Sequence, residues 1–431
     1  MYCITSAWQE LLGQFFHLFT KPGAKIFANL MTGWILCTAR RTITHILPFA
    51  DPLHSRAHDA YHRFFPDAHW IMNRLWQTLT LILVVGLRPK GIITLALDDT
   101  LFHHSGRKME GEGAWRDAVR STRTKRVYAW GLNLVVLTLQ IQPPWGGEPL
   151  GLPLNMRLHR KKEKTLIELA EEMINDVRTW LPERTIRVVG DGFYAPLAGK
   201  SLPDVTIVSR LRRDANLYDL LPKKNNRCKR RGHPETKGKK LAKLEKMASH
   251  IQNWERIEIR QRSKLIERLV YTRIVLWPKV TKKPIKVVLS RDPEGKEKDD
   301  FFFTTDVEMS ASDVLECYGD RWAIEDTFKN AKQSLGVQEP QTYKRQGPER
   351  AAALGLWLYS VVWFWYLQRK PNQRTFVVMP WYPEKAVPSF ADALSCLRRE
   401  LWTQRINLMF GNSSVHDHNF EFLIEALANA A

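Results

Sequence analysis

The sequence contains few cysteines, and no two of them form a C-x-x-C pair. The five are spread over 431 residues, at Cys3, Cys37, Cys228, Cys317 and Cys396. An odd, widely spaced set argues against a disulfide framework and against a structural zinc site. A glycine-rich Walker loop is also missing, so ATP is not implied. The N-terminus has neither a basic segment nor a small-residue cleavage site, so we expect no signal peptide and a protein of the reducing cytosol.

Acidic residues are outnumbered by basic ones. The chain has 45 Asp and Glu against 65 Lys and Arg, which gives a formal charge of +20 and a pI near 9.8. Such an excess favours a polyanionic partner. Apolar residues make up 44% of the chain, which excludes a disordered protein.

Long apolar runs are scarce as well. The most apolar stretch covers residues 351–367 and is 17 residues long, at the lower limit for crossing a bilayer. Aromatic residues crowd its second half. We expect a buried core helix and no membrane contact.

Changes in pattern along the chain predict five regions. Residues 1–88 carry apolar repeats at helical spacing. Strand and helix patterns alternate in two further regions, which predicts a mixed α/β core in two parts, residues 89–199 and 301–370. Residues 200–300 read as a mostly β insertion, and residues 371–431 as a helical region that could serve dimerisation.

Three carboxylates lie where the expected strands and one expected helix could bring them to a common site. Asp98 and Asp191 are each expected to end a core strand, and Glu325 lies on an expected helix. Three hard oxygen ligands suit two Mg²⁺ or Mn²⁺ ions. Singly, an Asp at a strand end is more often a turn former or a helix cap. Asp99 is an alternative to Asp98, because successive strand residues face opposite sides.

The expected helix over residues 318–336 has two distinct faces. Ile324, Phe328, Ala331 and Leu335 form an apolar stripe. Beside it, at spacings of 3, 4 and 7, lie Tyr318, Arg321, Glu325 and Lys332. We predict that this second face lies along a DNA backbone, with Glu325 holding metal and the cations holding phosphates. The bland alternative is an exposed ion-pair face, since Arg321 and Lys329 both stand four residues from Glu325.

The Tyr-x₂-Arg-x₃-Glu-x₆-Lys spacing resembles the signature of DDE transposases of bacterial insertion sequences, the IS-four group. "DDT" at 98–100 and "GDGFYA" at 190–195 resemble the two aspartate contexts of that group. The resemblance implies an RNase H-like catalytic core with a β insertion and an N-terminal helical DNA-binding unit. It also implies cut-and-paste transposition of double-stranded DNA with Mg²⁺ or Mn²⁺, by a homodimer on paired transposon ends, in the nucleoid of a bacterial cytoplasm.

Lys329 on the same expected helix and a separate basic segment complete the expected DNA contacts. Residues 223–247 hold eleven Lys or Arg and two acids, and they include Lys229, Arg230, Arg231, Lys239 and Lys240. We expect this segment to bind phosphates without reading sequence. Two rival functions are a structure-specific nuclease or resolvase on the same fold and a domesticated, non-catalytic DNA-binding protein.

Overall fold

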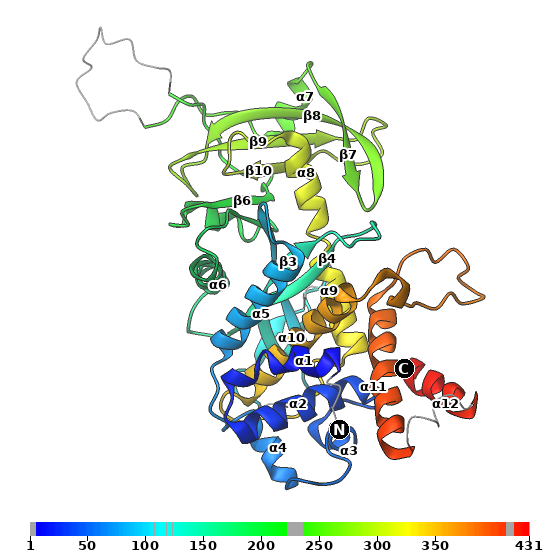
Figure 1. Cartoon of the computed structure of the whole chain (residues 1–431). Helices are drawn as coiled ribbons and strands as arrows, with labels where there is room; N and C mark the ends of the chain where they lie inside the picture. Colours follow the sequence, from blue (N-terminus) through cyan, green and yellow to red (C-terminus); the bar gives the residue numbers. More distant parts are fainter. Residues whose placement is uncertain are drawn as a thin grey trace.

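The computed structural model describes residues 6–106, 108–117, 119–122, 124–221, 236–410 and 418–430. Within them, most helices gather at one end of the molecule, and the other end consists mainly of strands (Figure 1).

The N-terminal region is helical, as predicted. It contains α1 (Ala7–Gly13), the short 3₁₀ turn η1 (Phe16–Leu18), α2 (Lys21–Leu36), α3 (Ile43–Ala50), α4 (His58–Phe64) and α5 (Met72–Leu87). Local chemistry sets the starts of three of them. The side chains of Ser6, Thr20 and Thr42 each accept a bond from a backbone N–H of the first turn.

A mixed sheet forms the centre of the fold. Its strands are β1 (Ile93–His103), the short β2 (Gly113–Arg116), β3 (Tyr128–Ile141), β4 (Leu150–His159), β5 (Ile186–Gly190) and β6 (Val205–Arg210). β3 pairs antiparallel with β1, β2 and β4, whereas β1, β5 and β6 run parallel to one another. Helix α6 (Leu166–Trp180) connects β4 to β5. This is the RNase H-like arrangement that was predicted.

The expectation that a strand ends at Asp98 is wrong, because β1 continues to His103. Its antiparallel ladder with β3 extends to the pair His103 and Gly131 and carries the strand past both acids. The parallel ladder with β5 stops earlier, at Leu97 opposite Gly190. Asp98 and Asp191 therefore follow directly after the last parallel pair.

The β-rich insertion extends the same sheet. It comprises α7 (Leu244–His250), β7 (Glu255–Gln261), β8 (Lys264–Leu276), β9 (Pro284–Arg291) and β10 (Asp300–Thr304). β10 pairs with β6, and the order continues β10-β9-β8-β7. The expected boundary at residue 200 thus falls before β6, a strand that is hydrogen-bonded to β5. The inserted strands begin after β6 and form the upper part of Figure 1.

The single helix expected over residues 318–336 is two helices in the structure. They are α8 (Ala311–Asp320) and α9 (Ala323–Ser334). Between the two helices the chain makes 3₁₀-type hydrogen bonds. The N–H groups of Arg321 and Trp322 donate to the carbonyl oxygens three residues earlier, those of Tyr318 and Gly319. Tyr318 consequently lies on a different helix from Glu325 and Lys332. The apolar stripe is confirmed, since Ile324, Phe328, Ala331 and Leu335 are all buried.

The C-terminal part is helical and includes α10 (Gly347–Gln368), the 3₁₀ turn η3 (Pro371–Gln373), α11 (Phe390–Phe410) and α12 (His418–Asn429). Among the described residues, α10 is the one helix long and apolar enough to cross a membrane, and 94% of its most apolar window is buried inside the protein. The prediction of a buried core helix is confirmed.

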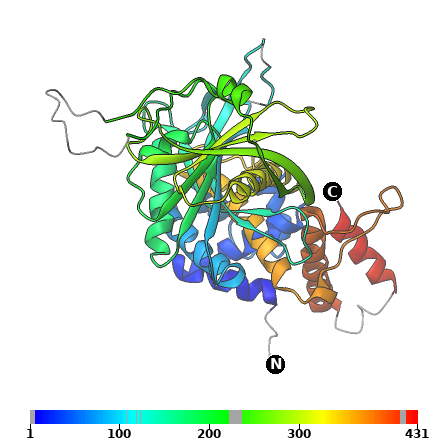
Figure 2. The same cartoon turned by 90° about the horizontal axis from the view of Figure 1, so that it is seen from above.

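Helices cover both faces of the sheet (Figure 2). In register, Asp99 lies opposite Val135 and Val135 lies opposite Arg157, whose guanidinium pairs with Asp176 of α6. The face that carries Asp99 is therefore the α6 face. Asp98 belongs to the other face, where α9 and α10 pack. One apolar core runs from Trp8 in α1 to Leu401 in α11, so the N-terminal helices share the core of the sheet.

Candidate active site at the end of the parallel strands

Two of the three predicted carboxylates come from adjacent parallel strands. Asp98 and Asp191 each follow the last pair of the β1–β5 ladder, which places them side by side at one edge. The turn after β5 is held by its own polar groups. Asp191 Oδ1 accepts the N–H of Phe193 at 2.9 Å, and the Asp191 carbonyl oxygen accepts from Ser209 Oγ at 2.8 Å. The chain around Asp191 is therefore fixed to β6.

Helix α9 brings the third carboxylate, Glu325, and two contacts fix this helix. The Thr327 hydroxyl lies 2.6 Å from the carbonyl oxygen of Gly151 in β4 and 2.9 Å from that of Ala323. This close approach needs a glycine, since a Cβ on Gly151 would stand 2.9 Å from Thr327 Oγ1. At the other end of α9, the Trp34 indole of α2 donates to the carbonyl oxygen of Leu335 at 2.7 Å.

Arg321 joins the helix to the strand. Its Nη1 donates to Asp98 Oδ2 at 2.9 Å, and its Nη2 donates to Glu325 Oε1 at 2.7 Å. Arg321 is buried, with 8% of its surface exposed. Burial disfavours its charge, yet Asp98, Tyr318 and Glu325 outweigh burial and raise its pKa. The exposed ion-pair alternative does not describe this arginine, because its partners lie on two elements and it is buried.

The two neighbouring aspartates point to different surroundings. Asp98 contacts Arg321, on the α9 face. Asp99 Oδ1 accepts from the Tyr194 hydroxyl at 3.2 Å, on the opposite face. Tyr194, in the turn after Asp191, is fully buried, and burial together with Asp99, Asp98 and Asp191 raises its pKa well above the usual value. Of the two acids, Asp98 is the one joined to Glu325.

The electrostatics around Asp98 favour a nearby cation. Burial, together with the neighbouring Asp99 and Asp191, raises the pKa of the Asp98 carboxyl to about 7 against the opposing effect of Arg321. Burial and Asp191 also raise the pKa of Asp99. Acids that disfavour each other's ionisation at a sheet edge form a typical functional-site pattern.

The donor set suits a divalent metal ion by its chemistry. Asp98, Asp191 and Glu325 offer only hard carboxylate oxygens, which Mg²⁺ and Mn²⁺ prefer. In this conformation, no three Asp, Glu, His or Cys side chains among the described residues are grouped closely enough to hold an ion. The guanidinium of Arg321 lies between two of the carboxylates instead. Asp98 and Glu325 could bind metal, together with Asp191, once Arg321 releases them.

A sequence profile of the DDE superfamily endonucleases matches residues 14–266, more than half of the chain. The chain belongs to the DDE superfamily of endonucleases. The matched range contains Asp98 and Asp191, and it ends before Glu325. No curated protein matches this DDE superfamily endonuclease. Membership implies a nuclease or transposase type of enzyme that acts on DNA with divalent metal ions.

In this endonuclease Lys332 and Tyr318 are less accessible to a DNA backbone than we predicted. The Lys332 ammonium donates to Thr100 Oγ1 at 2.8 Å and to the Leu101 carbonyl oxygen at 2.9 Å, so it faces β1. Burial lowers its pKa to about 8. Tyr318 packs its ring against Phe302, with 4.7 Å between centroids. In contrast, Lys329 is exposed.

The basic segment is described only in part. Lys229, Arg230 and Arg231 lie outside the described residues. Lys239 and Lys240 are exposed, and Lys240 bridges to Tyr218. Their role in DNA binding stays a prediction.

Two further features near the site were not predicted from the sequence. The Trp322 indole, 43% exposed, stacks under the Arg262 guanidinium of the insertion, 4.7 Å from the ring centre. Tyr194 reaches Asp99 from the turn after Asp191. Each of these aromatic residues lies within three positions of a predicted site residue in the sequence. That short separation was the one sequence feature that could have indicated their place near the site.

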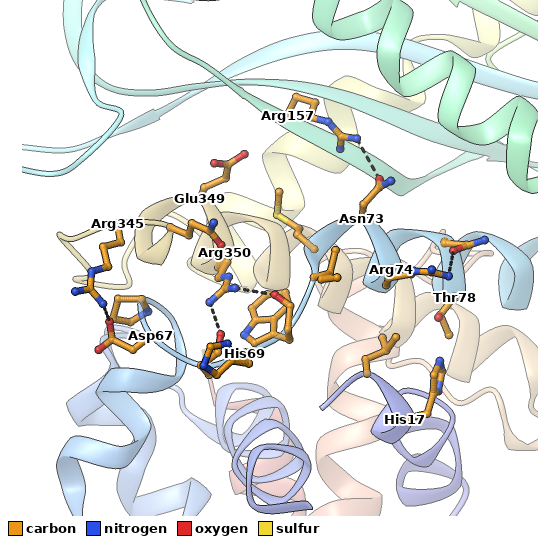
Figure 3. Close-up of a pocket in the computed structure, with 18 of the residues that line it drawn as sticks. His17, Asp67, His69, Asn73, Arg74, Thr78, Arg157, Arg345, Glu349 and Arg350 are labelled. Carbon is orange, nitrogen blue, oxygen red and sulfur yellow. Dashed lines mark hydrogen bonds and ion pairs between the residues drawn. The ribbon is translucent and has the colours of Figure 1, made fainter. Parts of the chain in front are cut away.

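A basic cavity of about 1370 Å³ lies where the N-terminal helices meet β4 and α10 (Figure 3). Five arginines line it against two acids; the lining charges are Arg74, Arg157, Arg160, Arg345, Arg350, Asp67 and Glu349. We call it the α5 groove. Arg350 has a structural role there, because it donates to the carbonyl oxygens of Phe65, Ala68 and Trp70. Arg74 is exposed and bonds only weakly to Gln77, at 3.4 Å.

Proposed function

We propose that this DDE superfamily endonuclease is a transposase of the IS-four type. It would cut the ends of a transposon and join them to target DNA by cut-and-paste movement. The observation that carries the proposal is the bridge made by Arg321. This arginine bonds to Glu325, four residues later in the sequence, and to Asp98 of β1, 223 residues earlier. The Tyr-Arg-Glu-Lys spacing of α8 and α9 supports the subgroup.

Asp98, Asp191 and Glu325 would hold a pair of metal ions, with Asp98 as the first ligand. Bound metal supplies activation of the attacking oxygen and charge neutralisation at phosphorus. The first step is hydrolysis: a water oxygen bonds to phosphorus, the P–O3′ bond breaks, and a 3′-OH is released. That 3′-OH then attacks a target phosphorus and displaces another 3′ oxygen.

The cationic residues would position the DNA. Arg321 can fork two oxygens of one phosphate once it leaves the carboxylates. Lys332, which bonds to β1 in this structure, would supply a point charge to a neighbouring phosphate. Tyr318 would donate its hydroxyl to a phosphate or stack on a displaced base, and the exposed Lys329 would add a phosphate contact. Lys239, Lys240 and the undescribed Lys229, Arg230 and Arg231 would add phosphate contacts in the insertion.

The wider assembly follows from the chemistry of joining. Two ends must be cut together, so we propose a homodimer on paired inverted repeats. The N-terminal helices would contact the ends, with the α5 groove as the basic surface available there. The setting proposed is the nucleoid of a bacterial cytoplasm.

A direct test uses DNA that borders the gene of this protein. Labelled duplexes carrying any inverted repeat found there are incubated with the full chain and Mg²⁺, with and without target plasmid. We expect nicking at the repeat boundary and covalent joining to the plasmid. Cutting without joining would favour a structure-specific nuclease or resolvase, and binding without cutting would favour a non-catalytic DNA-binding protein.

A further inference from the structure

Arg321 contacts two of the three proposed metal ligands at the same time. Its two terminal nitrogens bond to Asp98 Oδ2 at 2.9 Å and Glu325 Oε1 at 2.7 Å. A charged, forked donor of this kind binds carboxylates strongly in a partly buried place. One oxygen of each of these two carboxylates is therefore already bonded to another cation.

We propose that Arg321 is a resting counter-ion, and that a divalent ion must compete with it for Asp98 and Glu325. This inference rests on the proposed function, in which these carboxylates hold metal. Without Arg321, two acids beside Asp99 and Asp191 would face each other with their charges uncompensated. With it, Asp98 and Glu325 are held together and their charges are partly compensated before metal binds.

There is free space beside the Arg321 guanidinium into which it could move. Arg321 lines a cavity of about 140 Å³, together with Tyr318, Gly319 and Trp322. The Tyr318 ring centre lies 5.7 Å from the guanidinium carbon and offers a face to a released cation. Within the described residues, the buried Nε of Arg321 has no hydrogen-bond partner. One donor of the guanidinium is therefore left over while both carboxylates are bound, and it can meet a phosphate oxygen once the side chain rotates.

Metal binding without turnover tests the inference. Mn²⁺ binding to the full chain is measured by titration calorimetry and by the electron spin resonance of free Mn²⁺, in the absence of DNA. The set is wild type, Arg321→Gln, Arg321→Lys and Arg262→Gln. Arg262 is the matched control, because it lines the same cavity and stacks on Trp322 without bonding to Asp98 or Glu325.

We expect Arg321→Gln to bind Mn²⁺ about tenfold more tightly than wild type. Arg321→Lys keeps a competing charge and should fall between them, while Arg262→Gln should match wild type. Equal or weaker binding by folded Arg321→Gln overturns the counter-ion role alone. Absence of Mn²⁺ binding in every protein overturns the proposed metal-dependent function as well.

A measurement on the unaltered chain covers the case in which Arg321→Gln fails to fold. The side-chain ¹⁵N resonance of Arg321 is assigned by its loss in Arg321→Lys and followed during titration with Mg²⁺. Displacement predicts a shift that saturates together with Mg²⁺ binding. A resonance that stays unchanged while Mg²⁺ saturates the site contradicts the inference.

Discussion

The indole of Trp34 donates to the carbonyl oxygen of Leu335 at 2.7 Å, across 301 positions of sequence. Trp34 lies in α2, and Leu335 caps the end of α9, the helix that carries Glu325. Both residues are buried. The N-terminal helices therefore support α9 directly.

Replacing Trp34 by Phe should weaken both the fold and the site. A buried carbonyl oxygen would lose its donor, at a cost of about 1–3 kcal/mol in the free energy of unfolding. Urea unfolding measures this loss, and nicking of end DNA measures its effect on Glu325. Trp8→Phe is the matched control, since the Trp8 indole bonds to Thr32 at 3.0 Å within the N-terminal helices. If both variants nick at the same rate, α2 does not position α9.

Gly151→Ala should move α9 away from β4. The added methyl would lie 2.9 Å from Thr327 Oγ1 and 3.1 Å from the Ala323 carbonyl oxygen, both in α9. We expect a loss of about 1–3 kcal/mol from overpacking, together with slower nicking. Gly13→Ala is a suitable comparison, because nothing lies within 4 Å of its Cβ position. Wild-type stability in Gly151→Ala would show that α9 adapts freely.

Asp98→Asn, Asp191→Asn and Glu325→Gln should each abolish Mg²⁺-dependent nicking and leave DNA binding intact. Each change removes a charged oxygen ligand and keeps the shape of the side chain. Gel assays of nicking and of binding are run on the same labelled duplex. Asp99→Asn distinguishes the two neighbouring acids, since its side chain lies on the Tyr194 face. Loss of nicking in Asp99→Asn alone, with Asp98→Asn active, would move the first ligand by one residue.

Lys332 should make stability depend on pH in the alkaline range. Burial lowers its pKa to about 8 in the folded chain, whereas an unfolded lysine titrates near ~10.4. Between these values the unfolded chain binds more protons, so stability relative to Lys332→Met should rise as pH increases from about 8 to ~10.4. Below pH 8 the difference should be constant. Urea unfolding at several pH values measures it, and a flat difference throughout would mean that the ammonium is well solvated.

Neutralising Arg74 should weaken DNA binding and its salt dependence. Arg74 is exposed in the α5 groove, and each lost phosphate contact lowers the slope of log K against log salt by about one unit. Binding of Arg74→Gln is measured from low to high salt. Arg63→Gln is the control, because Arg63 is an exposed arginine of α4 that pairs with Asp59 outside the groove. Identical slopes for both variants would exclude the groove from the DNA path.

Much of the local structure was readable from residue patterns. The apolar repeats of residues 1–88 indicated the helices that end with α5, and the apolar stretch 351–367 lies within the buried helix α10. Apolar periodicity is a local property, so it survives folding unchanged. The break between α8 and α9 was missed because Arg321 and Trp322 keep helical backbone angles, and only their tighter hydrogen bonds separate the two helices.

The sequence by itself determined the strongly basic character, many of the helical and strand segments, the three candidate acids and the Tyr-Arg-Glu-Lys spacing around Glu325. Only the tertiary structure decided that Asp98 faces α9 while Asp99 faces Tyr194, and that Arg321 bonds to a carboxylate 223 positions away. It also turned Lys332 inward to Thr100. The physical reason is that the face of a strand residue and the partner of a long cation depend on which elements pack there, and strand pairing over long separations sets that packing.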